Sequence, residues 1–140
     1  MFTYKLATFL RFVGALLVCV VLAFFVVLCN VSAFPNEEKT EYYLYSASSQ
    51  AKIVKDVNLL DLLYVKGEKI ETKETDVEFL LAKYKASVVF EEKFEDKVAY
   101  YCYSPNLKTP VRIDGKFINL QIVVKRDSAI LASPLVFGGY

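Results

Sequence analysis

The sequence predicts an α+β protein in which an N-terminal transmembrane or signal helix precedes a curved antiparallel sheet packed against one helix. Three observations support this fold class. The stretch Phe12–Cys29 is 18 residues long and carries no charge. Short β-type runs separated by turn residues dominate the chain after it. One segment, residues 75–85, has apolar residues at helical spacing instead.

The apolar stretch is compatible with either a retained membrane anchor or a cleaved signal peptide. Its 18 residues approach the roughly 20 that a helix needs to cross a bilayer, and exceed the about 7–15 of a signal-peptide core. The more polar residues 29–33 nevertheless suit cleavage by a signal peptidase after Ala33. Residues 1–33 are therefore a signal peptide or a signal anchor. The expected membrane segment, residues 12–29, is represented by Phe12, Leu17, Val21, Phe25 and Cys29.

Flanking charges predict the orientation of this segment. Lys5 and Arg11 precede it, and the first charges after it are at residues 37–41. Because positive charge is retained on the cytoplasmic side, we expect a cytoplasmic N-terminus and a domain outside the cell membrane. The membrane is then a partner through residues 12–29 if the chain stays uncleaved. Cleavage after Ala33 would give a secreted protein.

The length and charge of the rest of the chain indicate its domain organisation and limit its partners. Without the first 33 of its 140 residues it retains 107, enough for one domain. We expect a linker at residues 34–41 and a single extracytoplasmic domain at 42–140. All 16 acidic residues and 15 of the 17 basic ones follow residue 33, so the domain has a net charge near −1. A domain with this near-neutral charge lacks the net positive charge that is typical of nucleic-acid-binding proteins.

The chain contains no histidine. This excludes Ser-His-Asp and Cys-His nucleophiles and the common histidine metal sites. We expect no cofactor and no metal, and the chain is more typical of a binding protein than of an enzyme. Only Cys102 lies in the predicted domain, so no disulfide can form within it. We expect Cys102 to be a buried apolar residue rather than an intermolecular partner.

Strands are expected at both ends of the first half of the domain. A tyrosine-rich run, residues 41–46, predicts the first strand. Residues 52–54 predict a short second one, followed by a helical turn or another strand in which Asp56 or Asn58 caps the turn. Gly67 interrupts the pattern, and residues 68–73 predict a weak, edge-like strand.

The helix of the domain is expected to run from about residue 75 to Lys85. Thr75 and Glu78 have the spacing of a capping box, with Thr75 as the N-cap. An apolar stripe at positions i, i+3, i+4 and i+7 should face the sheet; it consists of Val77, Leu80, Leu81 and Tyr84.

The second half predicts antiparallel strands. They are expected at residues 88–93, 98–104, 111–113, 117–125 and 129–137. Asp114-Gly115 predicts a tight hairpin, because both residues accept a positive φ. Pro134 should mark a bulge or an edge position in the last strand. Within residues 117–125 the aliphatic set should face the core: Ile118, Leu120, Ile122 and Val124.

The tyrosines supply the candidate functional residues. A stacking surface for a partner is one interpretation, and ordinary strand composition is the other. The residues expected on this surface are Tyr43, Tyr45, Tyr101 and Tyr103.

Three functions remain open. The leading one is a non-catalytic cell-envelope interaction module with an envelope protein partner. The alternatives are a carboxylate-dependent hydrolase and a structural subunit of a membrane complex. The acidic pairs Glu91/Glu92 and Glu95/Asp96 flank a turn and alternate with lysines, which is typical of a solvated surface. Ser48-Ser49 has no identifiable general base beside it.

The end of the chain resembles YwmB-like small exported proteins of spore-forming Firmicutes. The similarity covers residues 98–140 and rests on residues 100–104, 111–122 and 133–135 together with Gly138-Gly139-Tyr140. It implies an exported protein of the bacterial envelope, with a fold described as like the TATA-box-binding protein. That description concerns shape and implies no DNA binding. The chain is shorter than the usual member of the family.

Overall fold

The computed structural model describes residues 2–29, 32–35, 37, 39–58, 60–108, 110–137 and 139. It divides into two compact units, Met1–Val31 and Ser32–Tyr140, which are described separately. The elements in chain order are α1 (Phe2–Cys29), β1 (Thr40–Leu44), β2 (Lys52–Val54), the 3₁₀ helix η1 (Asp61–Tyr64), β3 (Val65–Thr72), α2 (Val77–Tyr84), β4 (Ser87–Lys93), β5 (Val98–Tyr103), β6 (Val111–Ile113), β7 (Lys116–Ile118), β8 (Leu120–Val124) and β9 (Ala129–Ser133).

The first unit consists of α1. Its 24-residue stretch Tyr4–Val27 has a mean hydropathy of 2.8 and is not buried. At 1.5 Å per residue it extends about 36 Å, so it is long and apolar enough to span a membrane or to act as a signal sequence. The helix begins at Phe2, ten residues before the predicted membrane segment, so Lys5 and Arg11 lie within it. Cys29, the last residue predicted for the segment, also ends the helix.

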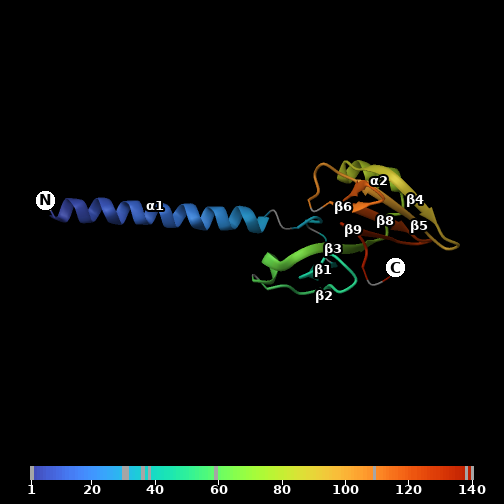
Figure 1. Cartoon of the computed structure of the whole chain (residues 1–140), viewed down its shortest axis with the longest axis horizontal. Helices are drawn as coiled ribbons and strands as arrows, with labels where there is room; N and C mark the ends of the chain where they lie inside the picture. Colours follow the sequence, from blue (N-terminus) through green and yellow to red (C-terminus); the bar gives the residue numbers. More distant parts are fainter. Residues whose placement is uncertain are drawn as a thin grey trace. The chain divides into compact units, whose positions relative to one another are not determined.

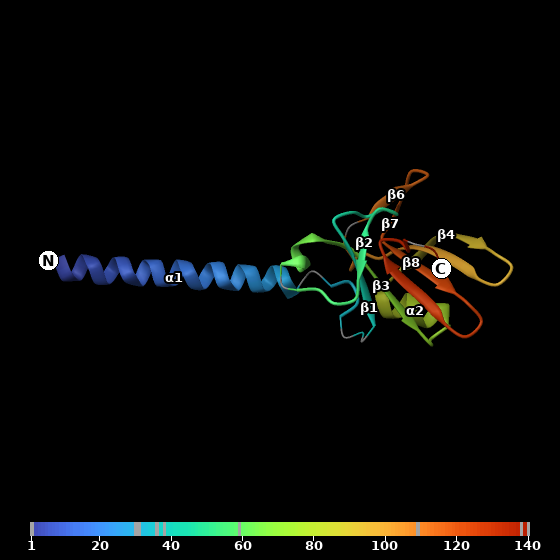
Figure 2. The same cartoon turned by 90° about the horizontal axis from the view of Figure 1, so that it is seen from below.

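The second unit is the predicted antiparallel sheet with one helix packed on it. Seven strands hydrogen-bond in the order β2-β1-β3-β9-β8-β5-β4, and every pairing is antiparallel. The strands β6 and β7 form a separate hairpin, which projects beyond the main sheet in Figure 2. The α+β fold class is confirmed.

Both faces of the sheet are covered near its middle. On one face, Leu80 of α2 packs with Ile122 and Leu131 in the larger core cluster. On the other, Val123 and Ile130 pack with Val136 of the C-terminal tail, residues 134–137. Figure 1 shows α2 and the tail on opposite sides of the strands. The predicted inward set of β7 and β8 is confirmed, but Val123 on the opposite face is equally buried because the tail covers it.

The N-cap of α2 differs from the prediction by one residue. Asp76, not Thr75, accepts hydrogen bonds from the backbone N–H groups of Glu78 (3.0 Å) and Phe79 (3.2 Å). Aspartate satisfies these otherwise unpaired donors and places negative charge at the positive end of the helix. The apolar stripe is confirmed, with Leu80 at its buried centre.

Asp76→Ala is therefore expected to lower the free energy of unfolding by about 1 kcal/mol, the usual effect of losing an N-cap. Thr75→Ala is the matched control and is expected to change it by less than about 0.5 kcal/mol. Urea unfolding of both variants, followed by circular dichroism, checks the assignment. A larger loss for the threonine variant would restore Thr75 as the cap.

Two expectations for the first half of the domain need correction. The edge-like strand predicted at 68–73 is the inner strand β3, which pairs with β1 on one side and β9 on the other. The many polar residues of β3 suggested an edge strand, but the strands that pair with it lie far away in the sequence. The linker predicted at 34–41 instead begins with the core residue Phe34 and ends inside β1. The alternative of a helical turn is realised as η1. Asn58 precedes this turn, and its side-chain oxygen accepts from the backbone N–H groups of Leu60 and Asp61.

The second half departs from prediction where polar residues interrupt the strands. The Asp114-Gly115 hairpin is confirmed, with φ of 48° and 79°. The single strand predicted at 117–125 is divided between β7 and β8 at Asn119. The last strand stops at Ser133, and Pro134 starts the tail rather than marking a bulge. Proline lacks the N–H that a continued ladder needs.

Candidate functional site

The four tyrosines predicted to form one surface lie in three different environments. Tyr43 is fully buried, at 0% exposure, whereas Tyr45 is 58% exposed and Tyr103 is 39% exposed. Tyr43 lies in β1 and Tyr45 directly after it, and β3, β9 and β8 separate β1 from β5, which carries the other two tyrosines. At about 4.8 Å between neighbouring strands, this puts β1 and β5 about 19 Å apart. The expected single surface is therefore divided, and Tyr43 does not belong to it.

Tyr43 has a structural role instead. Its ring meets that of Phe137 edge to face, with centroids 5.1 Å apart. Its hydroxyl accepts a hydrogen bond from the Phe137 N–H at 3.2 Å. Nearby, the N–H of Val136 donates to the side-chain oxygen of the buried Gln121 at 2.9 Å. These contacts hold the C-terminal tail against the sheet, and burial raises the pKa of Tyr43.

The second pair of predicted tyrosines contributes to a partly exposed aromatic surface, which we define as Phe90, Tyr101 and Tyr103. Phe90 and Tyr101 are half-buried, and Tyr103 is exposed. Phe90 and Tyr101 are cross-strand neighbours on β4 and β5 and stack with centroids 4.3 Å apart and planes at 15°. Tyr103 shares the face of Tyr101, because it lies two residues further along the strand.

Charged groups border this aromatic surface. The Lys116 ammonium lies 5.8 Å from the Phe90 ring centroid. The Tyr101 hydroxyl donates to the Glu92 carboxylate at 2.9 Å. The surface thus offers ring faces, one cation and one anion beside the edge strand β4, a composition that favours protein recognition. Near the other end of the sheet, the rings of Tyr45 and Tyr64 form a smaller, separate pair with centroids 5.3 Å apart.

A buried carboxylate that the sequence analysis missed lies on the helix side of the sheet. Glu68 of β3 is 1% exposed. Its side chain accepts hydrogen bonds from the Ala33 N–H (2.9 Å), the Phe34 N–H (3.2 Å) and the Ser32 hydroxyl (3.1 Å). The available signal was its spacing, because Glu68 shares a face with the core residue Ile70. The predicted cleavage position after Ala33 falls within this Glu68 cluster.

Burial raises the pKa of Glu68, and the hydrogen bonds from Ala33, Phe34 and Ser32 oppose this rise. Tyr42 of β1 is the titratable group opposite Glu68, while Ser133 faces it from β9. The pKa of Tyr42 is itself raised, chiefly by burial and secondarily by the charge of Glu68. Residues 32–34 contribute only neutral donors.

This shift predicts a pH dependence of stability in the uncleaved chain. A carboxyl whose folded pKa lies above its unfolded value of 4.5 contributes stability that is fully present below pH 4.5. The contribution is lost as the pH rises through the raised pKa, with a slope of at most about 1.4 kcal/mol per pH unit. Urea unfolding in detergent at a series of pH values should show this slope in the wild type. Glu68→Gln should remove it, whereas the exposed Glu71→Gln control should retain it.

Cys102 is confirmed as a buried apolar residue. It is a free thiol within the larger core cluster, and burial raises its pKa to about 12. A thiol in this environment is unreactive at neutral pH. Its burial counts against a role in intermolecular cross-linking.

The acidic pairs show no convergence in the described part of the chain. Glu91, Glu92, Glu95 and Asp96 are all exposed. Glu91 pairs with Lys93 at 3.0 Å, and no group of acidic or cysteine side chains among the described residues is arranged to hold a metal ion. The Ser48 hydroxyl lies 2.7 Å from that of Ser46, an arrangement typical of a loop.

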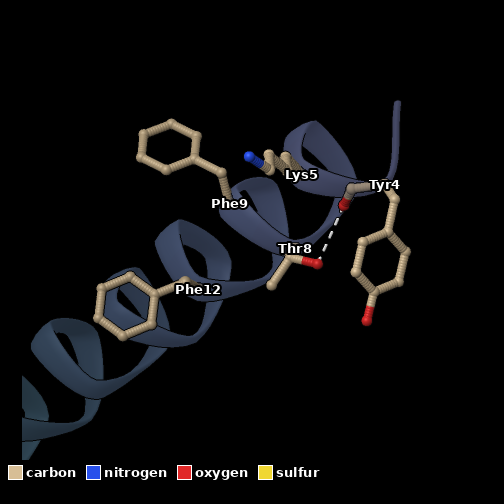
Figure 3. A pocket seen from close by; sticks show the side chains of 5 residues that line it. All are labelled: Tyr4, Lys5, Thr8, Phe9 and Phe12. Atoms are coloured by element: carbon tan, nitrogen blue, oxygen red, sulfur yellow. Dashed lines mark hydrogen bonds between the residues drawn. The ribbon is translucent and has the colours of Figure 1, made fainter. Parts of the chain in front are cut away.

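One hollow lies on α1 itself. Figure 3 shows that its lining comes from successive turns of a single helix, so nothing encloses it. The Thr8 hydroxyl donates to the Tyr4 carbonyl oxygen at 3.0 Å, which satisfies it within the helix as an apolar environment requires. The hollow is the space between neighbouring side chains; its lining residues are Tyr4, Lys5, Thr8, Phe9 and Phe12.

Searches against protein-family models, curated proteins and solved structures give no match.

Proposed function

We propose that this chain is a non-catalytic protein of the bacterial cell envelope, delivered by α1 and binding a protein partner through the aromatic surface. In this proposal the N-terminus is cytoplasmic and the domain lies outside the membrane. Lys5 and Arg11 precede the apolar residues, and the near-neutral domain gives no reason for a nucleic-acid partner. The resemblance to YwmB-like exported proteins belongs to the same hypothesis.

The observation that carries the binding role is the stacked pair Phe90–Tyr101 next to the exposed Tyr103. Phe90, Tyr101 and Tyr103 lie on the face of the sheet opposite α2. The C-terminal tail covers the middle of this face. At β1 and β3 the face carries the ion pair between Glu41 and Lys69, with 2.7 Å between the charged atoms. The aromatic surface is thus an apolar part of the face that the tail does not cover. Aromatic residues are enriched at protein interfaces, where they bury large area at low entropic cost.

Site-specific cross-linking in intact cells tests this role. A photoreactive phenylalanine at Tyr103 is expected to form an adduct with an envelope protein, and the same group at the exposed Asp127 is expected not to. Reversing the charge beside the surface with Lys116→Glu should weaken the Tyr103 adduct at least about fivefold, because it changes the electrostatic complementarity of the interface. Equal adducts from both positions, unaffected by Lys116→Glu, would contradict the proposed surface.

A further inference from the structure

Glu68 is held by donors that leave its charge uncompensated. Its carboxylate accepts from one hydroxyl and two backbone N–H groups, all of them neutral. None of the ion pairs among the described residues includes Glu68. An ionised carboxylate removed from water is costly without a counter-charge, even when it is well hydrogen-bonded.

The Phe34 nitrogen is fixed beside this carboxylate. The Phe34 side chain is 2% exposed and lies in the larger core cluster. Its ring packs edge to face on Tyr84 of α2, with centroids 5.4 Å apart. The side chain therefore anchors residue 34 independently of Glu68, and the backbone nitrogen stays 3.2 Å from a Glu68 oxygen.

We infer that Glu68 is the binding site for the α-ammonium group of Phe34, which is formed when the chain is cut after Ala33. Hydrolysis of the Ala33–Phe34 peptide bond by an export-associated endopeptidase consumes one water. Ala33 leaves with a carboxylate on the N-terminal fragment, and the Phe34 nitrogen takes up a proton to become an ammonium. The hydrogen bond from the neutral Phe34 N–H to the Glu68 carboxylate becomes a buried ion pair.

The exchange of donors favours the cut form. Glu68 loses the Ser32 hydroxyl and the Ala33 N–H, but it gains a full positive charge at the position of the Phe34 nitrogen. An opposite charge within hydrogen-bond distance stabilises an ionised carboxylate more than a neutral donor does. Because the folded domain buries Phe34 and engages the Ala33 N–H, the cut precedes folding. Docking of the new N-terminus then completes the core.

This inference rests on the export part of the proposed function and not on the aromatic surface. Its test uses the full-length chain expressed in an exporting bacterial host. Mass spectrometry of the mature protein gives the first residue, expected to be Phe34. An amine-acetylating reagent near pH 7 then measures access to the α-amino group, which normally has a pKa of about 7.7–8.0 and reacts ahead of lysines.

In the native wild type the Phe34 amine is expected to react at least about tenfold more slowly than in Glu68→Gln, and at the rate of a free peptide amine once urea unfolds the domain. Glu71→Gln, an exposed change on the same strand, should leave the protection intact. Should Glu68→Gln not fold, ¹⁵N NMR of the wild type provides the second measurement, with the pKa of the Phe34 α-amino group expected above about 8.

Three outcomes overturn the inference. The first is an exported chain that is never cut after Ala33. The second is a cut, folded wild type whose Phe34 amine reacts as fast as a free peptide amine or has an ordinary pKa. Both leave the proposed interaction role standing. The third, a chain retained in the cytoplasm, overturns this inference and the proposed envelope location together.

Discussion

Asn119→Ala is expected to lower the free energy of unfolding by about 3–5 kcal/mol, because two buried backbone groups and a third, part-buried one lose their partner. The Asn119 side-chain oxygen accepts from the Ser104 N–H at 2.7 Å. Its amide nitrogen donates to the carbonyl oxygens of Ser104 (2.7 Å) and Leu107 (2.9 Å). The side chain thus ties the loop after β5 to the junction of β7 and β8.

The control for this change is Asn106→Ala, an exposed asparagine in the same loop, which is expected to cost less than about 0.5 kcal/mol. Asn119→Asp is expected to be at least as damaging as alanine, because a carboxylate cannot donate to the two carbonyl oxygens. Urea unfolding followed by circular dichroism compares the three variants. Asn119→Ala within 1 kcal/mol of wild type would rule out this role for the hydrogen bonds.

Gly67→Ala is expected to destabilise the domain by about 2–3 kcal/mol through a steric clash within the sheet. A Cβ atom at residue 67 would lie 2.7 Å from the Ser133 carbonyl oxygen. It would also lie 3.0 Å from Cδ of Pro134 and 3.0 Å from a ring carbon of Tyr43. A backbone atom cannot move aside as a flexible side chain can, so β3 and β9 must separate.

The exposed neighbour Lys66→Ala provides the control for Gly67→Ala, and its expected effect is below about 0.5 kcal/mol. A second measurement follows from the geometry. Displacing Pro134 loosens the Tyr43–Phe137 contact, so limited proteolysis should remove the C-terminal tail of Gly67→Ala faster than that of Lys66→Ala. Equal stability and equal cleavage in both variants would show that the sheet has room at this position.

Local patterns predicted the local structure well. The Asp114-Gly115 hairpin and the apolar stripe of α2 each depend on residues a few positions apart, so their chemistry was visible in the sequence. Cys102 was placed correctly because it lies within a strand pattern, the tyrosine-rich run of residues 98–104. The N-terminal apolar helix was equally clear, although it begins earlier than the apolar stretch.

Long-range contacts account for what the sequence did not predict. β3 is polar enough to suggest an edge, and only its pairing with β9 makes it internal. Tyr43 and Tyr45 are indistinguishable by composition, but the tail buries one of them. The Glu68 cluster needs residues 32–34 and β3 together, and the Asn119 cluster joins two loops. Neither cluster has a local motif that would identify it.

The position of β9 in the sequence also limits the order in which the domain can fold. β3 is enclosed only when residues 129–133 arrive to pair with it, and these lie near the end of the 140-residue chain. Pairings of such long sequence separation form late and slowly. If the chain is exported as proposed, almost the whole domain has to cross the membrane before residues 32–34 can dock, and cleavage after Ala33 would compete with that docking.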